Sequence, residues 1–537
     1  MCGLMMLRTA IEIFLKGRWG LAVSQICILI VMVLYLGWVV AIGIRCSRKN
    51  KNVDDFYLGG RKLGPFVTAM SAEASDMSSW LLMGLPGVAY LSGIADAGWT
   101  AIGLGIGTYL NWLIVAKRLR KYSHVCGNSI TVPEFFSNRY RDKHNVLMAI
   151  AAAVILIFFI PYTASGFAAC GKLFASLFGA DYHIAMIISA VVIVAYTCTG
   201  GFLAASTTDF VQSIIMTIAL LIVLIFGTYS AGGLDAVMEN AKSMAGYLSM
   251  THIHDAATGE ANSYGILTIA STLAWGLGYF GMPHILLRFM AIEDSKKLSL
   301  SRRVATIWVV ISMAVAVFIG VIGSGMTANG VVPVLEGSDS ETIIVRISSY
   351  LSSKGVVPAL IAGVILAGIL ASTMSTADSQ LLAASSGVSH NIIGGLLKIK
   401  TTEKQSMLIA RITLVVISAI AVVLAWDPNS SVFGIVSFAW AGFGAAFGPV
   451  VLFSLFWKRT NKWGALAGMI SGGAMVFIWK YAVRPIGGVW GIYELLPAFI
   501  VACIFIVAVS LLTPAPSQEI IDEFDRVKDF DETAANA

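Results

Sequence analysis

The decamer from Ser71 to Trp80, which reads SAEASDMSSW, carries two carboxylates and four hydroxyls inside an apolar stretch that runs from Pro65 to about Leu91. At the centre of a bilayer, one charged side chain costs about 2.5 to 3.5 kcal/mol on insertion scales. Charged residues within membrane spans therefore face a protein interior, where they mark the path of an ion or a substrate. This decamer is the first candidate site.

Two adjacent hydroxyls in a second apolar stretch fit the same chemistry. Ser375 and Thr376 close the segment ASTMST, which begins at Ala371. A hard cation prefers oxygen ligands, and carbonyls together with hydroxyls supply them without a fixed carboxylate. The alternative is that both hydroxyls bond back to carbonyls of their own helix, as small hydroxyl side chains in membrane helices do. The residues alone leave both interpretations open.

The composition indicates which elements must hold these residues. Of the 537 residues, 57% are apolar and only 12% are charged, and the mean hydropathy is +0.82, which excludes a soluble domain. Strands of membrane barrels alternate in polarity over about 10 residues, whereas Ile214 to Phe226 is apolar on all sides apart from Thr217. The sequence therefore predicts an all-α polytopic membrane protein.

A helix needs about 20 apolar residues to cross the hydrocarbon core. The chain contains about thirteen such stretches, centred near residues 33, 78, 107, 160, 191, 218, 275, 314, 372, 416, 443, 472 and 502. We expect one transmembrane domain over residues 21–513, and little chain remains for anything else.

Two of the predicted spans are interrupted, and they lie about 200 residues apart. Hydroxyls and Asp76 compete for backbone hydrogen bonds in the first, whereas glycines and Pro283 weaken the second, WGLGYFGMPH, from Trp275 to His284. Each interrupted span begins a set of five spans. Paired interruptions at corresponding positions indicate an inverted-repeat transporter with its site at the bilayer midplane. The repeats are expected at about 65–228 and 263–456.

Gly103, Gly105 and Gly107 lie inside the third predicted span. No strand precedes them, so a dinucleotide site is excluded and close helix packing is expected instead.

Basic residues set the expected orientation. The net charge of +6 comes from Lys and Arg beside the ends of spans rather than from a nucleic-acid-binding patch. The clusters are Arg45 to Lys51 with Arg61 and Lys62, Lys117 to Lys121, Arg288 to Arg303, Lys398 to Lys404, and Lys458 to Lys462. With thirteen spans, all of these fall on the cytoplasmic face, so the N-terminus is expected outside.

Both terminal segments are expected to be peripheral to the transmembrane domain. Residues 514–537 form an acidic cytoplasmic tail, for which we expect disorder. Residues 1–20 are expected to lie outside the membrane core, although Arg8, Lys16 and Arg18 would then be external, against the charge rule.

Four sequence blocks resemble a known family. They are GGRKLGPFVTAMSAEASDMSSWLLMGLPG from Gly59, GGFLAASTTDFVQ from Gly200, WGLGYFGMPHILLRFMA from Trp275, and AWAGFGAAFGPVVLF from Ala439. From about Asp54 to Pro514 the chain resembles the sodium:solute symporters, and within them the bacterial members that carry proline. The resemblance implies two inverted five-helix repeats like those of the leucine transporter, with one helix before them and two after. It also implies sodium-coupled import of L-proline across the inner membrane of a bacterium.

The resemblance implies a set of ion-binding residues. Sodium would be held by the carbonyls of Ala74, Met77 and Ser372 and the hydroxyls of Ser375 and Thr376. Asp76, Ser78 and Asp209 match positions that the family uses for ion coupling. Two of these have simpler alternatives, because Asp76 could cap the helix at the break and Asp209 could be an N-cap ahead of an apolar run.

A substrate site for proline needs aromatic faces together with backbone amides and carbonyls. Trp275 and Tyr279 lie one helical turn apart and could form one aromatic wall. The resemblance adds Trp80 and Tyr162 to this wall and places Gly84 nearby for close backbone approach. The alternative is ordinary packing of aromatic residues at helical spacing.

Glu73 departs from the family pattern, which often has glycine at this position. Its carboxylate could raise cation affinity, bind a proton or pair with a base. Pairing with Arg61 is the simplest expectation, and Arg61 completes the residues assigned to ion coupling.

Other functions fit the sequence less well. It has no nucleophile elbow, HExxH motif or acid/base pair typical of an enzyme, and the cysteines show no CxxC spacing. Two alternatives stay open: a symporter of the same fold for another small solute, and a transporter-like membrane sensor. We expect sodium, proline and lipid as partners, no nucleic acid, and a functional monomer.

Overall fold

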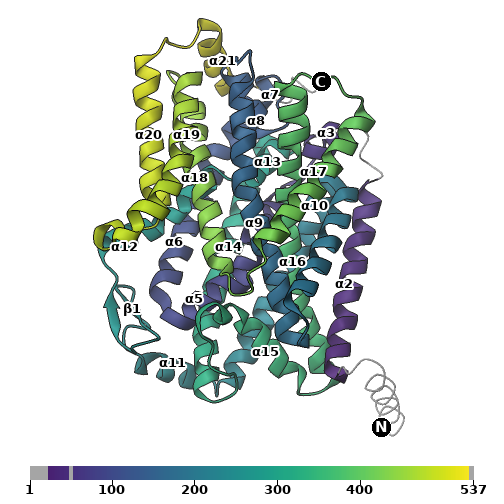
Figure 1. Cartoon of the computed structure of the whole chain (residues 1–537), viewed down its shortest axis with the longest axis vertical. Coiled ribbons are helices and arrows are strands. Elements are labelled where there is room, and N and C mark those ends of the chain that lie inside the picture. The colour runs from purple at the N-terminus through teal and green to yellow at the C-terminus, as the bar shows by residue number, and fades with distance from the viewer. Residues whose placement is uncertain (1–21, 48–52, 531–537) are drawn as a thin grey trace.

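The computed structural model describes residues 22–47 and 53–530. Long helices pack side by side into a bundle, and the described residues contain one two-stranded sheet, which lies at an end of the bundle (Figure 1). The prediction for residues 1–20 falls outside the described residues.

The first half of the described chain contains the following elements: α2 (Val23–Ser47), α3 (Val53–Leu58), η1 (Gly59–Arg61), α4 (Pro65–Ser79), η2 (Trp80–Gly84), α5 (Leu85–Ser92), α6 (Ile94–Leu110), η3 (Asn111–Val115), α7 (Ala116–Val125), α8 (Val132–Arg139), α9 (Val146–Phe178), α10 (Tyr182–Ser230), α11 (Leu234–Ser243), β1 (His252–His254) and β2 (Ala261–Ser263). The two strands pair antiparallel, with Ile253 opposite Asn262.

The second half contains α12 (Ile266–Leu273), η4 (Ala274–Phe280), α13 (Pro283–Ala291), η5 (Ser295–Lys297), α14 (Leu298–Ala328), η6 (Gly337–Thr342), α15 (Ile343–Ser352), α16 (Val356–Ser386), η7 (Gly387–Leu396), α17 (Glu403–Leu424), α18 (Val432–Phe456), α19 (Lys462–Ile478), η8 (Trp479–Val483), η9 (Arg484–Ile486), η10 (Gly488–Trp490), α20 (Leu495–Leu512) and α21 (Gln518–Asp529).

Ten helices in the described ranges are long and apolar enough to cross a membrane. The other three expected spans coincide with helices that are broken or bent: α4 to α5, the first arm of α10, and α12 to α13. The structure is therefore compatible with thirteen spans, and the bundle of membrane helices is as predicted.

The first broken helix runs through α4, η2 and α5. Ser78 has φ 44° and ψ −171°, so the helix is interrupted there, and a π-helical turn follows from Trp80. A positive φ is uncommon for a residue with a Cβ and is found where the surrounding structure holds it. The second broken helix runs through α12, η4 and α13, where a 3₁₀ segment ends at Gly281 before Pro283 restarts the helix. Both interruptions lie where the sequence predicts them.

Long helix α10 bends at Gly201, whose φ of 66° and ψ of −175° suit glycine. The bend divides α10 into two arms. Asp209 lies in the second arm, eight residues beyond the bend, inside the helix rather than at its start. The N-cap alternative for Asp209 is therefore wrong.

The glycines of the third span pack as expected. A Cβ on Gly103 would lie 2.5 Å from the carbonyl oxygen of Leu273, and one on Gly107 would lie 2.3 Å from that of Gly276. Because these distances are too short for any side chain, α6 lies backbone to backbone against the second broken helix.

The prediction of a disordered acidic tail is wrong for residues 518–529, which form helix α21. Helix α21 lies at the same end of the bundle as α7 and α8, while β1 and α11 lie at the opposite end (Figure 1). Phe524 is buried, and the Arg118 guanidinium lies 4.5 Å from the centre of its ring. Arg141 pairs with both Glu519 and Glu523. The charged composition favoured disorder, but apolar residues on one face of α21 bind it to the bundle.

Candidate functional site

Asp76 lies between the two broken helices. Its carboxylate oxygen Oδ2 accepts a hydrogen bond of 2.7 Å from the Tyr279 hydroxyl, and its backbone carbonyl accepts one of 3.1 Å from the Tyr162 hydroxyl. The other carboxylate oxygen, Oδ1, is buried and has no hydrogen-bond partner among the described residues. A buried carboxylate with a free oxygen needs a counter-charge, and a cation supplies one.

An aromatic cage, which we define as Trp80, Trp275, Phe433, Trp440 and Tyr493, lies beside this carboxylate, and Trp80, Trp275 and Trp440 line one small cavity with Asp76. The Trp275 ring lies 5.6 Å from Trp80, 5.5 Å from Phe433 and 5.1 Å from Tyr493, measured between ring centroids. The indole of Trp440 donates a 2.7 Å hydrogen bond to the carbonyl of Trp275. The cage thus joins the second broken helix to α18 and to the segment before α20.

The expected substrate residues lie together at this place. Trp80 and Trp275 contact each other in the cage as a tilted ring pair, and Tyr162 and Tyr279 donate hydrogen bonds to Asp76. A Cβ on Gly84 would lie 3.3 Å from both Phe433 and Trp80, so glycine permits the close approach there. The residues Phe433, Trp440 and Tyr493 were missed, although Trp440 stands in one of the four sequence blocks.

The cage is closed in this conformation. A cavity of about 10 Å³ remains between Asp76, Met77, Trp80, Tyr162, Trp275 and Trp440, together with Leu104 and Val436. This volume holds about one water molecule. An amino acid can enter only when aromatic rings move apart, which suits a site opened and closed by helix movement.

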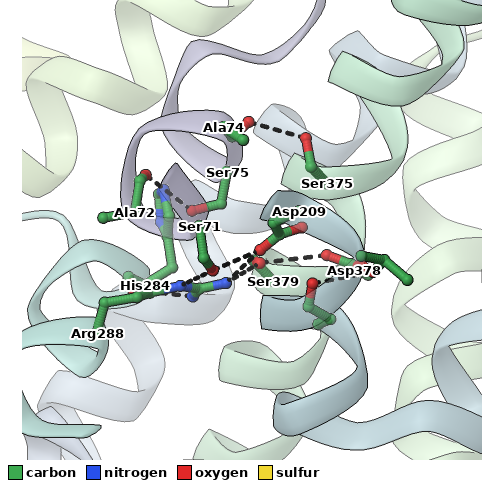
Figure 2. Close-up of polar contacts among 12 residues, drawn as sticks. Ser71, Ala72, Ala74, Ser75, Asp209, His284, Arg288, Ser375, Asp378 and Ser379 are labelled. Atoms are coloured by element: carbon green, nitrogen blue, oxygen red, sulfur yellow. Dashed lines mark hydrogen bonds and ion pairs between the residues drawn. The ribbon is translucent and has the colours of Figure 1, made fainter. Parts of the chain in front are cut away.

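Of the two hydroxyls of α16, that of Ser375 reaches the first broken helix (Figure 2). Ser375 donates to the carbonyl of Ala74 at 2.8 Å and to that of Ser372 at 3.2 Å. Thr376 donates to the same Ser372 carbonyl at 3.1 Å. Bonding back along the helix and contact across to α4 therefore occur together. Four of the five expected sodium ligands form one connected group of oxygens.

The fifth expected ligand, Met77, lies at the helix break. Its carbonyl accepts from the backbone N–H of Trp80, which also donates to the Ser78 hydroxyl oxygen at 3.0 Å. Ser78 therefore caps the resumed helix. The Asp76 side chain accepts from Tyr279 rather than from a backbone amide, so the alternative that Asp76 caps the helix is wrong, and Ser78 has that role.

A buried charge network lies one helical turn below (Figure 2). The guanidinium of Arg288 binds Asp209 at 3.0 Å, Ser379 at 2.6 Å and Ser71 at 3.0 Å. Ser71 also donates to Asp209 at 2.7 Å. Arg288 and Asp209 are 1% and 0% exposed. This network joins the first broken helix to α10, α13 and α16.

A second carboxylate, which the sequence analysis did not select, belongs to this network. Asp378 accepts from the Ser379 hydroxyl at 3.2 Å, and its Oδ2 has no partner in the described part of the chain. Asp209 Oδ1 is likewise without one. Arg288 thus binds Asp209 directly and reaches Asp378 through the Ser379 hydroxyl. The spacing of Asp378 three residues after Ser375, on the same helix, was the signal that could have identified it.

Glu73 does not pair with Arg61. Its Oε1 accepts a 2.8 Å hydrogen bond from the indole of Trp112, and its Oε2 is buried without a partner in the ranges that the structure describes. Arg61 instead donates to the carbonyls of Met290 and Ser129 at 2.6 Å and 2.8 Å. Arg61 therefore joins η1 to the end of α13 and to the loop after α7.

Replacing Glu73 by glutamine is expected to leave transport and folding almost unchanged. The amide oxygen still accepts from Trp112, and no ion pair is lost. Uptake rates within about twofold of the parent are expected, whereas Glu73→Ala leaves the indole N–H unsatisfied and costs about 1 to 3 kcal/mol. Uptake and thermal unfolding of both variants measure this. Loss of sodium-dependent uptake in a well-folded Glu73→Gln protein would show that the charge itself is required.

A family model decides what kind of protein this arrangement belongs to. The model of the sodium:solute symporter family matches residues 56–472. The chain belongs to that family. It is a sodium-coupled secondary transporter rather than an enzyme, and the family resemblance found in the sequence is confirmed.

Relatives of the same family are similar over most of the chain. A sodium/proline symporter of Haemophilus influenzae is 42% identical over 504 residues, which cover 93% of this chain and 97% of the relative. The high-affinity proline transporter PutP of Bacillus subtilis is 43% identical over 494 residues, covering 91% and 98%. The osmoregulated proline transporter OpuE of the same bacterium is 41% identical over 491 residues, covering 91% and 96%.

Two solved structures share the fold. A sodium-coupled sialic acid symporter in a substrate-bound outward-open state has a TM-score of 0.74 at 18% identity, covering 92% of this chain and 99% of that one. A nucleobase-cation-symport-1 family transporter in a closed conformation has a TM-score of 0.51 at 12% identity, covering 89% and 99%. These likenesses confirm the predicted class, a helical sodium symporter fold with two inverted repeats.

Proposed function

We propose that this chain imports L-proline together with sodium by alternating access. The observation that carries the proposal is the buried Asp76 carboxylate, with one free oxygen, beside an aromatic cage at the meeting point of two broken helices. The names of the relatives, which are proline transporters at 41 to 43% identity, support the substrate. Sodium neutralises the site, and proline fills the cage.

Sodium is assigned to the carbonyls of Ala74, Met77 and Ser372 and the hydroxyls of Ser375 and Thr376. Binding there requires each hydroxyl to turn its proton away, so that its oxygen faces the ion. The ion then replaces the hydrogen bond between α16 and α4 and orders the first broken helix. Because Asp76 and Trp80 lie on the same helix break, sodium and proline strengthen each other's binding, and this coupling is reciprocal.

Proline is assigned to Trp80, Tyr162, Trp275, Tyr279 and the backbone at Gly84. Its ring packs on the indoles, and its ammonium group lies over an aromatic face. Helix amides freed at the breaks are suited to the carboxylate.

The sodium gradient supplies the energy. At about −100 mV and a tenfold gradient, one sodium ion provides roughly 2.3 plus 1.4 kcal/mol, enough for accumulation of several hundredfold. Asp76, Ser78 and Asp209 are assigned to coupling together with Arg61, which joins α13 to the loop after α7. The basic clusters support an orientation with the N-terminus outside and α21 in the cytoplasm of a bacterial cell, and the proposed transport unit is a monomer.

Uptake of labelled proline into proteoliposomes tests the proposal. The purified protein is given an inward sodium gradient, with potassium-only and proton-gradient controls. Accumulation that requires sodium is expected. Absence of proline uptake under every gradient would refute the substrate, and competition by other solutes would then identify the true one.

Trp275→Ala is expected to weaken proline binding by roughly 10- to 100-fold, as loss of a buried aromatic anchor does. Sodium binding should change by less than about twofold, because Trp275 contributes no sodium ligand. Proline and sodium titrations of the purified protein measure both. Trp490→Ala is a matched control, since Trp490 is 48% exposed and, among the described rings, contacts only that of Trp479. Equal loss of both affinities would show that Trp275 is structural.

A further inference from the structure

A long groove runs along the outer surface between α6 and α14. Its volume is about 720 Å³, and its walls include Ile102, Ile106, Tyr109, Val310 and Phe318. Apart from the Tyr109 hydroxyl, the lining consists of apolar side chains and glycines. Ile106 is 53% and Val310 51% exposed, so the groove faces the surrounding bilayer. It follows α6 from Ile94 to Leu110, roughly 25 Å of helix, most of the hydrocarbon core.

A basic group stands at one end of this groove. The Arg302 guanidinium lies 5.4 Å from the centre of the Tyr109 ring, and its Nε is buried without a hydrogen-bond partner among the described residues. Arg303 and Lys296 are exposed nearby. This end lies beside α7, because Arg120 of α7 donates to the carbonyl of Ile292, just before η5. Among the described residues that line the opposite end, at Met250, none is basic.

Both walls of the groove press on the broken helices from outside. Gly103 and Gly107 bring α6 against η4, as described above. On the other wall, a Cβ at Gly320 of α14 would lie 2.4 Å from the carbonyl oxygen of Pro86 in α5. Whatever fills the groove therefore fixes the separation of two helices that each support one half of the candidate site.

We propose that one anionic phospholipid binds in this groove, with an acyl chain between α6 and α14 and its phosphate on Arg302 and Arg303. The apolar wall accommodates the chain, and the cationic mouth selects an anionic headgroup. A second copy of the protein fits less well. Two copies in one membrane share the same orientation, so a two-fold contact here would bring their Arg302 and Arg303 residues to the same depth and oppose like charges.

Native mass spectrometry of the purified protein tests this inference without reference to the transported solute. The protein is titrated with palmitoyl-oleoyl phosphatidylglycerol and, separately, with phosphatidylcholine of the same chains. One phosphatidylglycerol molecule is expected to bind more tightly than the rest. Arg302→Gln/Arg303→Gln should weaken it roughly 25-fold, about fivefold for each arginine. Ala314→Phe, which fills the groove from an exposed position, should also abolish this binding.

Two control variants match these changes. Lys400→Gln/Lys404→Gln removes the same charge at exposed positions just before and at the start of α17, and Ala153→Phe adds the same ring to an exposed position on α9. Both should keep the tight lipid. Sodium-driven uptake in vesicles with and without 30% phosphatidylglycerol gives a second measurement. Only Arg302→Gln/Arg303→Gln and Ala314→Phe should lose the response to anionic lipid.

Three results would overturn the inference. If the Arg302→Gln/Arg303→Gln protein bound phosphatidylglycerol as tightly as the parent, the two arginines would not form the headgroup site. Equal retention of phosphatidylcholine would make the groove unselective. A protein dimer that Ala314→Phe dissociates would assign the groove to a second copy of the chain.

Discussion

The Arg288→Met protein should be less stable than the parent by about 3 to 5 kcal/mol, because removing one partner leaves buried charges without compensation. The Arg288 guanidinium binds Asp209, and it is linked to Asp378 through the Ser379 hydroxyl. Methionine keeps much of the volume, so the loss reports charge rather than packing. Thermal unfolding in detergent measures the loss, and sodium-driven uptake should be abolished.

A second substitution separates charge from other causes. If the uncompensated Asp209 carboxylate is responsible, Arg288→Met/Asp209→Asn should recover part of the lost stability, as expected for two coupled residues. Arg526→Met, at an exposed position of α21, serves as the control and should change little. A double variant less stable than Arg288→Met would contradict the assignment of the network.

Asp76→Asn is expected to raise the sodium concentration for half-maximal uptake about a hundredfold. At about 6 Å and an effective dielectric constant of about 20, one charge contributes roughly 2.8 kcal/mol to binding of the ion. The hydrogen bond from Tyr279 survives, because the amide oxygen still accepts it. Sodium binding measured directly, and uptake at a series of sodium concentrations, should therefore change while the fold is kept.

Asp96 offers a matched control for this substitution. Its carboxylate accepts a 2.8 Å hydrogen bond from the Tyr264 hydroxyl, much as Asp76 accepts one from Tyr279. Asp96→Asn should leave the sodium dependence unchanged. If the sodium concentration for half-maximal uptake were unchanged in Asp76→Asn, or shifted equally in Asp96→Asn, Asp76 would not be part of the ion site.

The sequence predicted the fold and the helix breaks because both depend on local patterns. Apolar length defines a membrane helix, and the breaks appear as hydroxyls around Asp76 and as glycines before Pro283. The close contact of α6 with η4 was also predictable, since small residues at helical spacing allow it. The tail was misjudged because charge dominates its composition, while Ile520, Phe524 and Val527 form an apolar stripe only when wound into a helix.

The site was harder to predict where distant segments meet. Asp209, Arg288 and Asp378 come from three helices, and nothing in the chain order shows that they share one network. Glu73 was expected to bind the base at Arg61, but its indole partner, Trp112, is 39 positions away and lies inside another span. A carboxylate in an apolar stretch is conspicuous in the sequence because its burial is unfavourable. The sequence does not show which residue it binds when that residue is distant in the chain.

The docking of α21 has a consequence for how the protein is made. The contact between Arg118 and Phe524 joins residues 406 positions apart. At about 5 to 20 residues per second, the ribosome takes roughly 20 to 80 s to cover that distance. Throughout this interval, in the proposed orientation, the surfaces of α7 and α8 that α21 will cover face the cytosol, where chaperones and proteases can reach them. A nascent chain thus hides this surface only near the end of its synthesis, and a copy truncated before Gln518 leaves it exposed for degradation.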